Sequence, residues 1–163
     1  MSRAFVKEDD GAPEEPLPDR AVSEHPNQVT ARGLARLEAR RDELETERLE
    51  LARRADDDEA ARDRLRYVDR DLRYLARRLE TATVVEPPPP GGAVRFGSAV
   101  LVRDASGVAH RYTVVGEDEA DPDAGLVSWV SPLARVLEGA RAGETVTWKR
   151  PAGSLTLTIE SVE

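Results

Sequence analysis

The 163-residue sequence contains no cysteine, which excludes disulfide bonds and thiolate metal sites. Aromatic residues make up only 4% of the chain and hydrophobic residues 39%, which supports no more than a modest core. No run approaches the ~20 apolar residues of a membrane-spanning helix, and the first seven residues lack the apolar segment of a signal peptide. We therefore expect a soluble, cytoplasmic protein without a membrane partner.

Charge, in contrast, is abundant. Charged residues make up 34% of the chain, and the net charge is -8. The two signs are balanced over residues 30–82, and the acidic excess lies on either side, in 1–29 and 83–163. Because affinity for duplex nucleic acid depends on neutralising phosphates, an acidic chain binds it poorly. Any contact with nucleic acid should be local, through the Arg-rich residues 30–82.

An apolar stripe with coiled-coil spacing runs through this charged region, in steps of three and four, over Leu65, Val68, Leu72, Leu75, Leu79 and Ala82. So narrow a stripe needs a partner helix, which is offered upstream by Leu34, Leu37, Leu44 and Leu51. Arg41 and Arg48 occupy intervening positions, where their methylene groups can lie on the seam. The pattern predicts an antiparallel helical hairpin over residues 30–83, with Thr30 as the first N-cap.

The turn between the two helices is acidic and contains Asp56, Asp57, Asp58 and Glu59. Carboxylate oxygens suit Mg²⁺, which usually takes one or two protein carboxylates and keeps waters and phosphates as its other ligands. The alternative is structural: Asp56 or Asp57 caps the second helix, and its neighbours lie favourably near that helix N-terminus. Both interpretations can hold together, since one Asp can cap while others face outward.

Five arginines surround this turn: Arg53, Arg54, Arg62, Arg64 and Arg66. They could steer RNA or line the wall of a binding channel. The interpretation we favour is a solvated helix face on which arginines pair with neighbouring Asp and Glu residues.

The composition changes on both sides of the hairpin. Residues 1–29 combine Asp, Glu and Pro with few large apolar groups and should form a flexible arm. Residues 84–92 contain four prolines and two glycines, which is typical of a polyproline II linker. From 93 to 163 the hydrophobic period becomes two, which predicts one short helix at 132–137 and strands at 94–96, 99–102, 111–115, 126–130, 145–148 and 155–159. The fold class is therefore α+β: a helical hairpin followed by an antiparallel sheet that carries a single helix.

Six segments resemble patterns of one family, at the right separations: 30–37 (T-x-x-G-x-x-x-L), 64–75 (a second-helix pattern), 96–100 (F-G-A-x-V), 114–121 (I-V-G-D-D-E-A-D), 131–135 (S-P-[IL]-A-R) and 151–153 (P-x-G). The family is that of the bacterial transcript-cleavage factors GreA and GreB, and the second helix resembles the GreB branch. The resemblance covers residues 28–163.

The resemblance implies an FKBP-like C-terminal domain, without prolyl isomerase activity, that binds RNA polymerase at the rim of its secondary channel. The hairpin would enter that channel, so contact with nascent RNA and DNA would be indirect. The implied docking surface consists of Glu117, Asp118, Glu119 and Asp121, next to Ser131, Pro132, Leu133 and Ala134. The structural alternative is a solvated acidic turn, and we expect Ser131 to cap the short helix with Pro132 at its first position in either case.

In that family, paired acidic residues at the hairpin tip help to hold a Mg²⁺ shared with the polymerase, which then cleaves backtracked RNA. Here Asp56 and Asp57 would be the shared Mg²⁺ contacts, with no tightly bound cofactor and no enzymatic activity of the chain's own. The tip motif G-D-[LR]-x-E-N-[AS]-[ED]-Y is absent, and the hairpin is about two heptads short, which removes about 10 Å of reach. This favours regulation by channel occupancy over stimulated cleavage. The alternative function is a coiled-coil adaptor unrelated to polymerase, and we expect a monomer.

Overall fold

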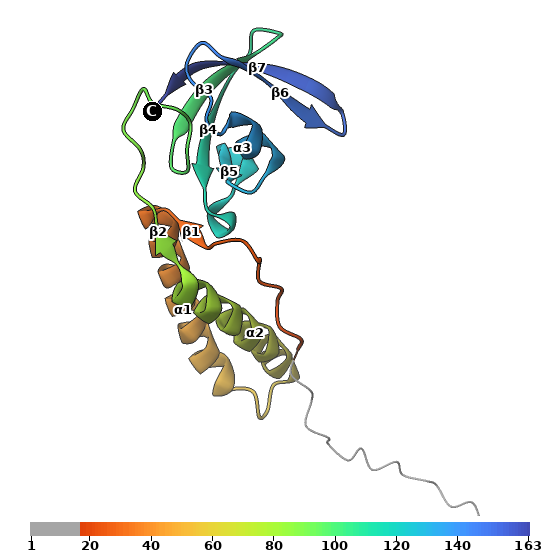
Figure 1. The fold of residues 1–163 in the computed structure, drawn as a ribbon. Coiled ribbons are helices and arrows are strands. Elements are labelled where there is room, and N and C mark those ends of the chain that lie inside the picture. The colour runs from red at the N-terminus through yellow and green to blue at the C-terminus, as the bar shows by residue number, and fades with distance from the viewer. Residues whose placement is uncertain (1–16) are drawn as a thin grey trace, which may run out of the picture.

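A computed structural model describes residues 17–163 of the chain. It contains an elongated hairpin of two helices and a sheet domain that lies at the open end of the hairpin (Figure 1). None of the helices within residues 17–163 is long and apolar enough to cross a membrane. The helices and strands are β1 (Gln28–Val29), α1 (Ala31–Ala52), α2 (Glu59–Thr81), β2 (Thr83–Val84), β3 (Ala99–Asp104), β4 (Ala109–Val115), η1 (Glu117–Glu119), η2 (Pro122–Ala124), β5 (Leu126–Ser128), α3 (Pro132–Leu137), β6 (Thr145–Arg150) and β7 (Gly153–Val162).

The predicted hairpin is confirmed. Thr30 has extended backbone angles, and its Oγ1 accepts a hydrogen bond from the Gly33 N–H at 2.8 Å, so it is the N-cap of α1. The buried seam is made of Leu37 and Leu44 from α1 and Val68 and Leu75 from α2. The other predicted seam residues except Leu65 pack against them and are partly buried. Helix α1 has 22 residues, which corresponds to a length of about 33 Å.

The N-terminal part of the chain differs from the expected flexible arm. Residues 1–16 lie outside the described residues, but residues 17–29 run alongside the hairpin (Figure 1). Strand β1 pairs in parallel with β2, and Val29 is only 3% exposed within the hairpin core. Sequence periodicity cannot predict such short strands, because two residues are too few to display a period.

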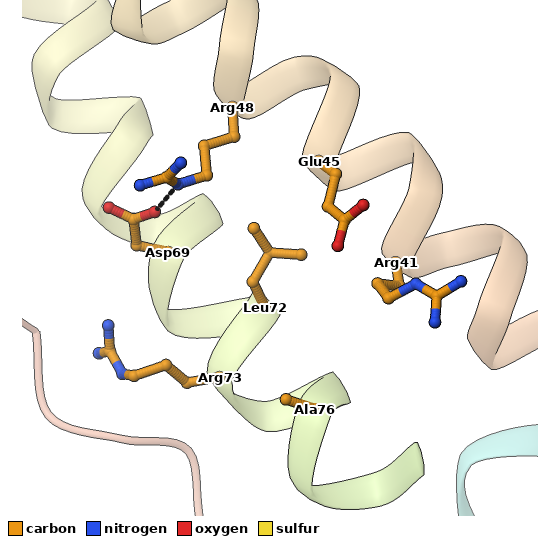
Figure 2. A pocket seen from close by; sticks show the side chains of 7 residues that line it. All are labelled: Arg41, Glu45, Arg48, Asp69, Leu72, Arg73 and Ala76. Carbon is orange, nitrogen blue, oxygen red and sulfur yellow. Dashed lines mark hydrogen bonds and ion pairs between the residues drawn. The ribbon is translucent and has the colours of Figure 1, made fainter. Parts of the chain in front are cut away.

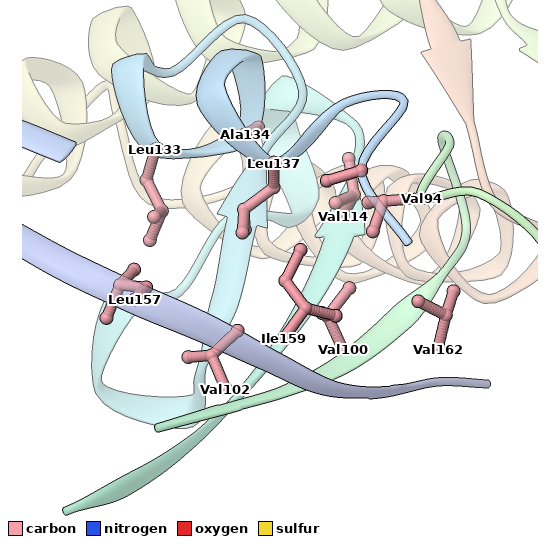
Figure 3. Close-up of a cluster of buried hydrophobic side chains, with 11 residues drawn as sticks. Val94, Val100, Val102, Val114, Leu133, Ala134, Leu137, Leu157, Ile159 and Val162 are labelled. Atoms are coloured by element: carbon pink, nitrogen blue, oxygen red, sulfur yellow. The ribbon is translucent and has the colours of Figure 1, made fainter. Parts of the chain in front are cut away.

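The C-terminal domain is a five-stranded sheet in the order β5-β4-β3-β7-β6, with α3 lying against one face. Its core is formed by inward-facing side chains of the sheet, by α3 and by two loop residues, Val94 and Ala140 (Figure 3). The sheet and α3 contribute Val100, Val102, Val114, Leu133, Ala134, Leu137, Leu157, Ile159 and Val162. Trp129 and Trp148 are both partly buried against this core. Trp148 lies in β6 as expected, whereas Trp129 follows the end of β5 and is not in a strand. The predicted α+β class is therefore confirmed.

Two details of the predicted sheet are wrong. Strand β5 pairs with β4 in parallel, so the sheet is mostly rather than entirely antiparallel. Residues 94–96 are not a strand, because Val94 bonds the loop after α3: its N–H donates to the Ala140 carbonyl at 2.8 Å, and its carbonyl accepts from the Gly139 N–H at 2.8 Å. The linker is tied to the sheet too, since the Gly91 N–H donates to the Val162 carbonyl at 2.8 Å.

Candidate functional site

The tip of the hairpin, between α1 and α2, presents the first candidate site. Asp58 is the N-cap of α2, and its Oδ1 accepts a hydrogen bond from the Ala61 N–H at 3.1 Å. Its Oδ2 accepts from Arg54 Nη2 at 2.5 Å. The Ala61 N–H and the Arg54 guanidinium together hold the pKa of Asp58 below its usual value. The cap is thus Asp58, not Asp56 or Asp57 as the sequence suggests. Both carboxylate oxygens of Asp58 accept hydrogen bonds from the chain itself.

The remaining tip carboxylates face solvent. Asp56 and Asp57 are exposed on a turn whose backbone is held by Arg62, and Glu59, the first residue of α2, is exposed as well. Arg62 Nε donates to the Ala55 carbonyl at 3.1 Å, and its Nη2 donates to the Asp56 carbonyl at 3.2 Å. Arg62 therefore holds the turn in a shape that presents Asp56 and Asp57 outward.

Two other arginines near the tip pair with acidic side chains, as the solvated-face interpretation predicts. Arg64 makes two hydrogen bonds to Glu47 across the hairpin, at 2.7 and 3.0 Å. Arg66 lies 3.6 Å from Asp63, and Arg53 is exposed. Among residues 17–163, no group of three or more His, Asp or Glu side chains could hold a metal ion.

A shallow pocket of about 400 Å³ lies between the helices above the tip (Figure 2). Leu72 forms its floor, and Arg41 and Arg48 border it from α1, at the seam positions where the sequence places arginine instead of leucine. Arg48 Nε donates to Asp69 Oδ1 at 2.6 Å and so closes one end of the pocket. The arginine side chains thus border the seam without filling it.

The acidic loop forms the second candidate site, where η1 meets the base of the hairpin. Asp118 accepts two hydrogen bonds from α2: Oδ1 from the Tyr74 hydroxyl and Oδ2 from Arg78 Nε, both at 2.5 Å. The Arg78 side chain is only 2% exposed, and Glu117 Oε2 lies 3.9 Å from its Nη2. Burial and the hydrogen bond to Asp118 raise the pKa of Tyr74 to about 12.

Glu119 makes the matching contact to α1. Its side chain is 4% exposed, and Oε2 accepts from the Thr30 hydroxyl at 2.6 Å. The same Thr30 oxygen caps α1, so the helix cap and the contact between domains depend on one side chain. Gly33 makes room for it, because a Cβ at this position would lie 2.5 Å from Glu119 Oε2.

These contacts change the expected docking surface. Asp118 and Glu119 bind the chain's own hairpin rather than facing outward, and Leu133 and Ala134 are 4% and 3% exposed in the sheet core. Ser131 caps α3, with its Oγ accepting from the Ala134 N–H at 3.2 Å and Pro132 in the first turn. Exposed or half-buried members of the expected surface are Glu117, Asp118, Asp121, Ser131 and Pro132. Docking stays a prediction for them, and the Asp118 carboxylate is already bonded to α2.

Comparisons with known proteins give the chain its family. A profile of the C-terminal part of the transcription elongation factors GreA/GreB matches residues 89–163. The transcription elongation factor GreB of Xanthomonas axonopodis pv. citri is 37% identical over 150 residues, which cover 83% of this chain and 89% of that protein. The chain belongs to the GreA/GreB family.

Other relatives of this GreA/GreB-family chain match over shorter stretches. The GreB of Neisseria meningitidis serogroup A is 40% identical over 102 residues, which cover 61% of this chain and 63% of that protein. Among solved structures, the GreA factor homolog 1 of Thermus thermophilus is 23% identical, with a TM-score of 0.41 over 85% of this chain and 99% of that chain. Family membership rests on the sequence relationship to the Xanthomonas protein.

Sequence reasoning missed the hairpin side of the second site in this GreA/GreB-family chain. Tyr74 and Arg78 are four residues apart and therefore lie on one face of α2, beside the seam. That spacing is a signal for a shared partner, but Asp118 lies 44 residues beyond Tyr74. Nothing in a single sequence links the two across that separation.

Proposed function

We propose that this chain binds RNA polymerase through its C-terminal domain, inserts its hairpin into the secondary channel and regulates elongation by occupying the channel. Membership of the GreA/GreB family supports the transcription elongation role and favours it over an unrelated adaptor. Stimulation of RNA cleavage is weak or absent in this proposal. The observation that carries this step is the use of Asp58 as a helix cap, bound by Arg54, in a tip that lacks the family motif.

The chemistry of the tip fits a limited role in binding a Mg²⁺ shared with the polymerase. Asp56 and Asp57 have the hard oxygen ligands that Mg²⁺ prefers, and both are exposed. They are therefore the residues that would contact a Mg²⁺ shared with the polymerase. Direct ligation requires an oxygen about 2.1 Å from the ion, whereas a heptad missing from each arm withdraws the tip by about 10 Å. Occupying the channel makes no such demand on distance.

The cleavage step is tested on a stalled, backtracked elongation complex whose RNA is labelled at its 5′ end. We expect the wild-type protein to slow nucleotide addition, to shorten the RNA little, and to act equally after the double substitution Asp56→Ala/Asp57→Ala. The control is Glu50→Ala, which removes an exposed carboxylate from α1. If the RNA shortens with the wild type and the control but not with the double variant, the tip carboxylates promote cleavage and channel occupancy alone is wrong.

Docking is tested separately by capture of purified polymerase. Asp121→Asn removes a charge but keeps the oxygen that caps η2, where Asp121 Oδ1 accepts from the Ala124 N–H at 3.3 Å. We expect this variant and Pro132→Ala to bind polymerase more weakly, and Asp123→Asn, two residues along the same loop, to bind normally. Absence of binding by the wild type at micromolar concentration would contradict the proposed function.

A further inference from the structure

The N-terminal segment (residues 17–22) is bound to one face of α2. Its central contact is Asp19, whose carboxylate lies between two arginines one helical turn apart: Arg73 Nε donates to Oδ1 and Arg77 Nη2 donates to Oδ2, both at 2.6 Å. Arg73 Nη2 also donates to the Leu17 carbonyl at 3.0 Å. Arg73 lines the pocket between the helices, and its guanidinium points toward the N-terminal segment (Figure 2). The two arginines thus form a carboxylate-binding site that the chain itself fills.

The next residue makes the opposite kind of contact. The Arg20 guanidinium lies 3.9 Å from the centre of the Tyr74 ring, and its Nη1 is 3.4 Å from Asp71 Oδ1. Acidic Asp19 therefore meets basic residues and basic Arg20 meets an acidic and an aromatic residue, within two turns of α2. This charge matching argues that the contact is specific, since a merely acidic segment would meet arginines alone.

The residues that follow the N-terminal segment, from Asn27 onward, are attached to the hairpin much more firmly. Asn27 is 7% exposed, and its Nδ2 donates to the Arg78 carbonyl at 2.6 Å and to Thr81 Oγ1 at 3.1 Å. Strand β1 follows, paired with β2. By contrast, the Asp19 and Arg20 side chains are 38% and 44% exposed, and exposed ion pairs contribute little and weaken with salt. The N-terminal segment can therefore leave α2 while Asn27 and β1 stay in place.

We propose that the N-terminal segment is a displaceable cover of the hairpin, and that it must leave Arg73 and Arg77 before the hairpin can enter the polymerase channel. This inference rests on the proposed function. The segment lies on the outside of α2 and therefore widens the hairpin. Its Asp19 carboxylate also occupies hydrogen-bond donors of two arginines, Arg73 and Arg77, on the surface that enters the channel. The free protein is then partly inhibited. Its apparent affinity for polymerase is the intrinsic affinity multiplied by the fraction of molecules in which the segment has left α2.

The cover itself is tested without polymerase. Because the chain has no cysteine, Ala21→Cys provides a single site for a nitroxide label in the N-terminal segment. We expect Asp19→Asn, and transfer from about 0.05 to about 0.5 M salt, to make the label more mobile in electron paramagnetic resonance spectra. Glu24→Gln removes the same charge from an exposed residue nearby and should leave the spectrum unchanged. A label that is equally mobile in the wild type and in Asp19→Asn overturns the proposal.

The consequence is tested by titrating polymerase with the unlabelled proteins. We expect Asp19→Asn to bind about 3- to 10-fold more tightly than the wild type and Glu24→Gln at low salt, as the loss of two exposed ion pairs implies. The difference should disappear at about 0.5 M salt. Failure of all three proteins to bind contradicts the proposed function. Equal binding by all three at low salt leaves that function intact and overturns the cover.

Discussion

Removal of the Asp118 carboxylate is the sharpest test of how the two domains are held together. In Asp118→Ala, the Arg78 guanidinium, 2% exposed, loses its hydrogen-bonded carboxylate, and the Tyr74 hydroxyl loses its acceptor. Removing one partner of a fully buried ion pair costs about 3–5 kcal/mol. Here Asp118 is itself 18% exposed, and Glu117 Oε2 is 3.9 Å from Arg78 and supplies part of the missing charge. We therefore expect a loss of about 2–4 kcal/mol in the free energy of unfolding.

The chain allows the two domains to be followed separately in urea. Both tryptophans, Trp129 and Trp148, lie in the sheet domain, so their fluorescence reports its unfolding, whereas circular dichroism at 222 nm reports mainly the hairpin helices. In the wild type the two transitions should coincide, because Asp118 and Glu119 couple the domains. In Asp118→Ala they should separate, with the hairpin unfolding first.

The matched control for this experiment is Asp123→Ala, which removes an exposed carboxylate from the same loop. We expect it to change stability by less than about 0.5 kcal/mol. If Asp118→Ala behaves like Asp123→Ala, with coincident transitions, the pair with Arg78 does not couple the domains and the reasoning is refuted.

Two further predictions concern the contact between the domains. Gly33→Ala should lower the free energy of unfolding by about 1–2 kcal/mol, because the new Cβ displaces the Glu119 carboxylate held by Thr30, and this overpacking outweighs the gain in helix propensity. Thermal unfolding measures the change, and a variant more stable than the wild type would contradict the prediction. The Tyr74 pKa of about 12 exceeds that of an unfolded tyrosine, about 10, so its contribution is complete below pH 10 and is lost as the pH rises toward 12. Unfolding measured from pH 9 to 11 should show a steeper loss of stability for the wild type than for Tyr74→Phe, and parallel curves would show that the hydroxyl plays no part.

The hairpin and most strands could be predicted because their periods are carried by many residues. The seam repeats over both helices, and the alternation at Val100 and Val102, repeated at Leu157 and Ile159, marks two central strands with one buried face. Strand direction carries no such signal: β5 is parallel to β4 because the chain passes through η1 and η2 before it pairs. The strand expected at residues 94–96 does not form. Val94 is buried, as in a strand, but its backbone bonds the loop after α3 instead of a neighbouring strand.

The site could be predicted in its residue types but not in its partners. Carboxylates at the tip and in the loop were identified, yet the sequence does not tell which of them the fold itself uses. Asp58 was missed as the cap because three consecutive aspartates are equally good candidates, and the choice depends on where the helix begins. Glu119 was assigned to the surface because acidic residues in loops are usually exposed, whereas a threonine 89 residues away binds it.

Some carboxylates of the two sites are bonded within the fold and others are exposed to solvent. Only the exposed ones can be substituted to test partner binding without changing the fold. Asp58, Asp118 and Glu119 each accept hydrogen bonds that fix a helix end or a domain contact, so substitution there changes the fold as well as any docking. Asp56 and Asp57 are exposed, and the turn that presents them is held through backbone carbonyls by Arg62. Substituting them should leave the hairpin unchanged, because no described contact depends on their side chains. A loss of function at these two positions would therefore report on contact with a partner rather than on stability. For this reason Asp56 and Asp57, and not the carboxylates bonded within the fold, distinguish cleavage from channel occupancy.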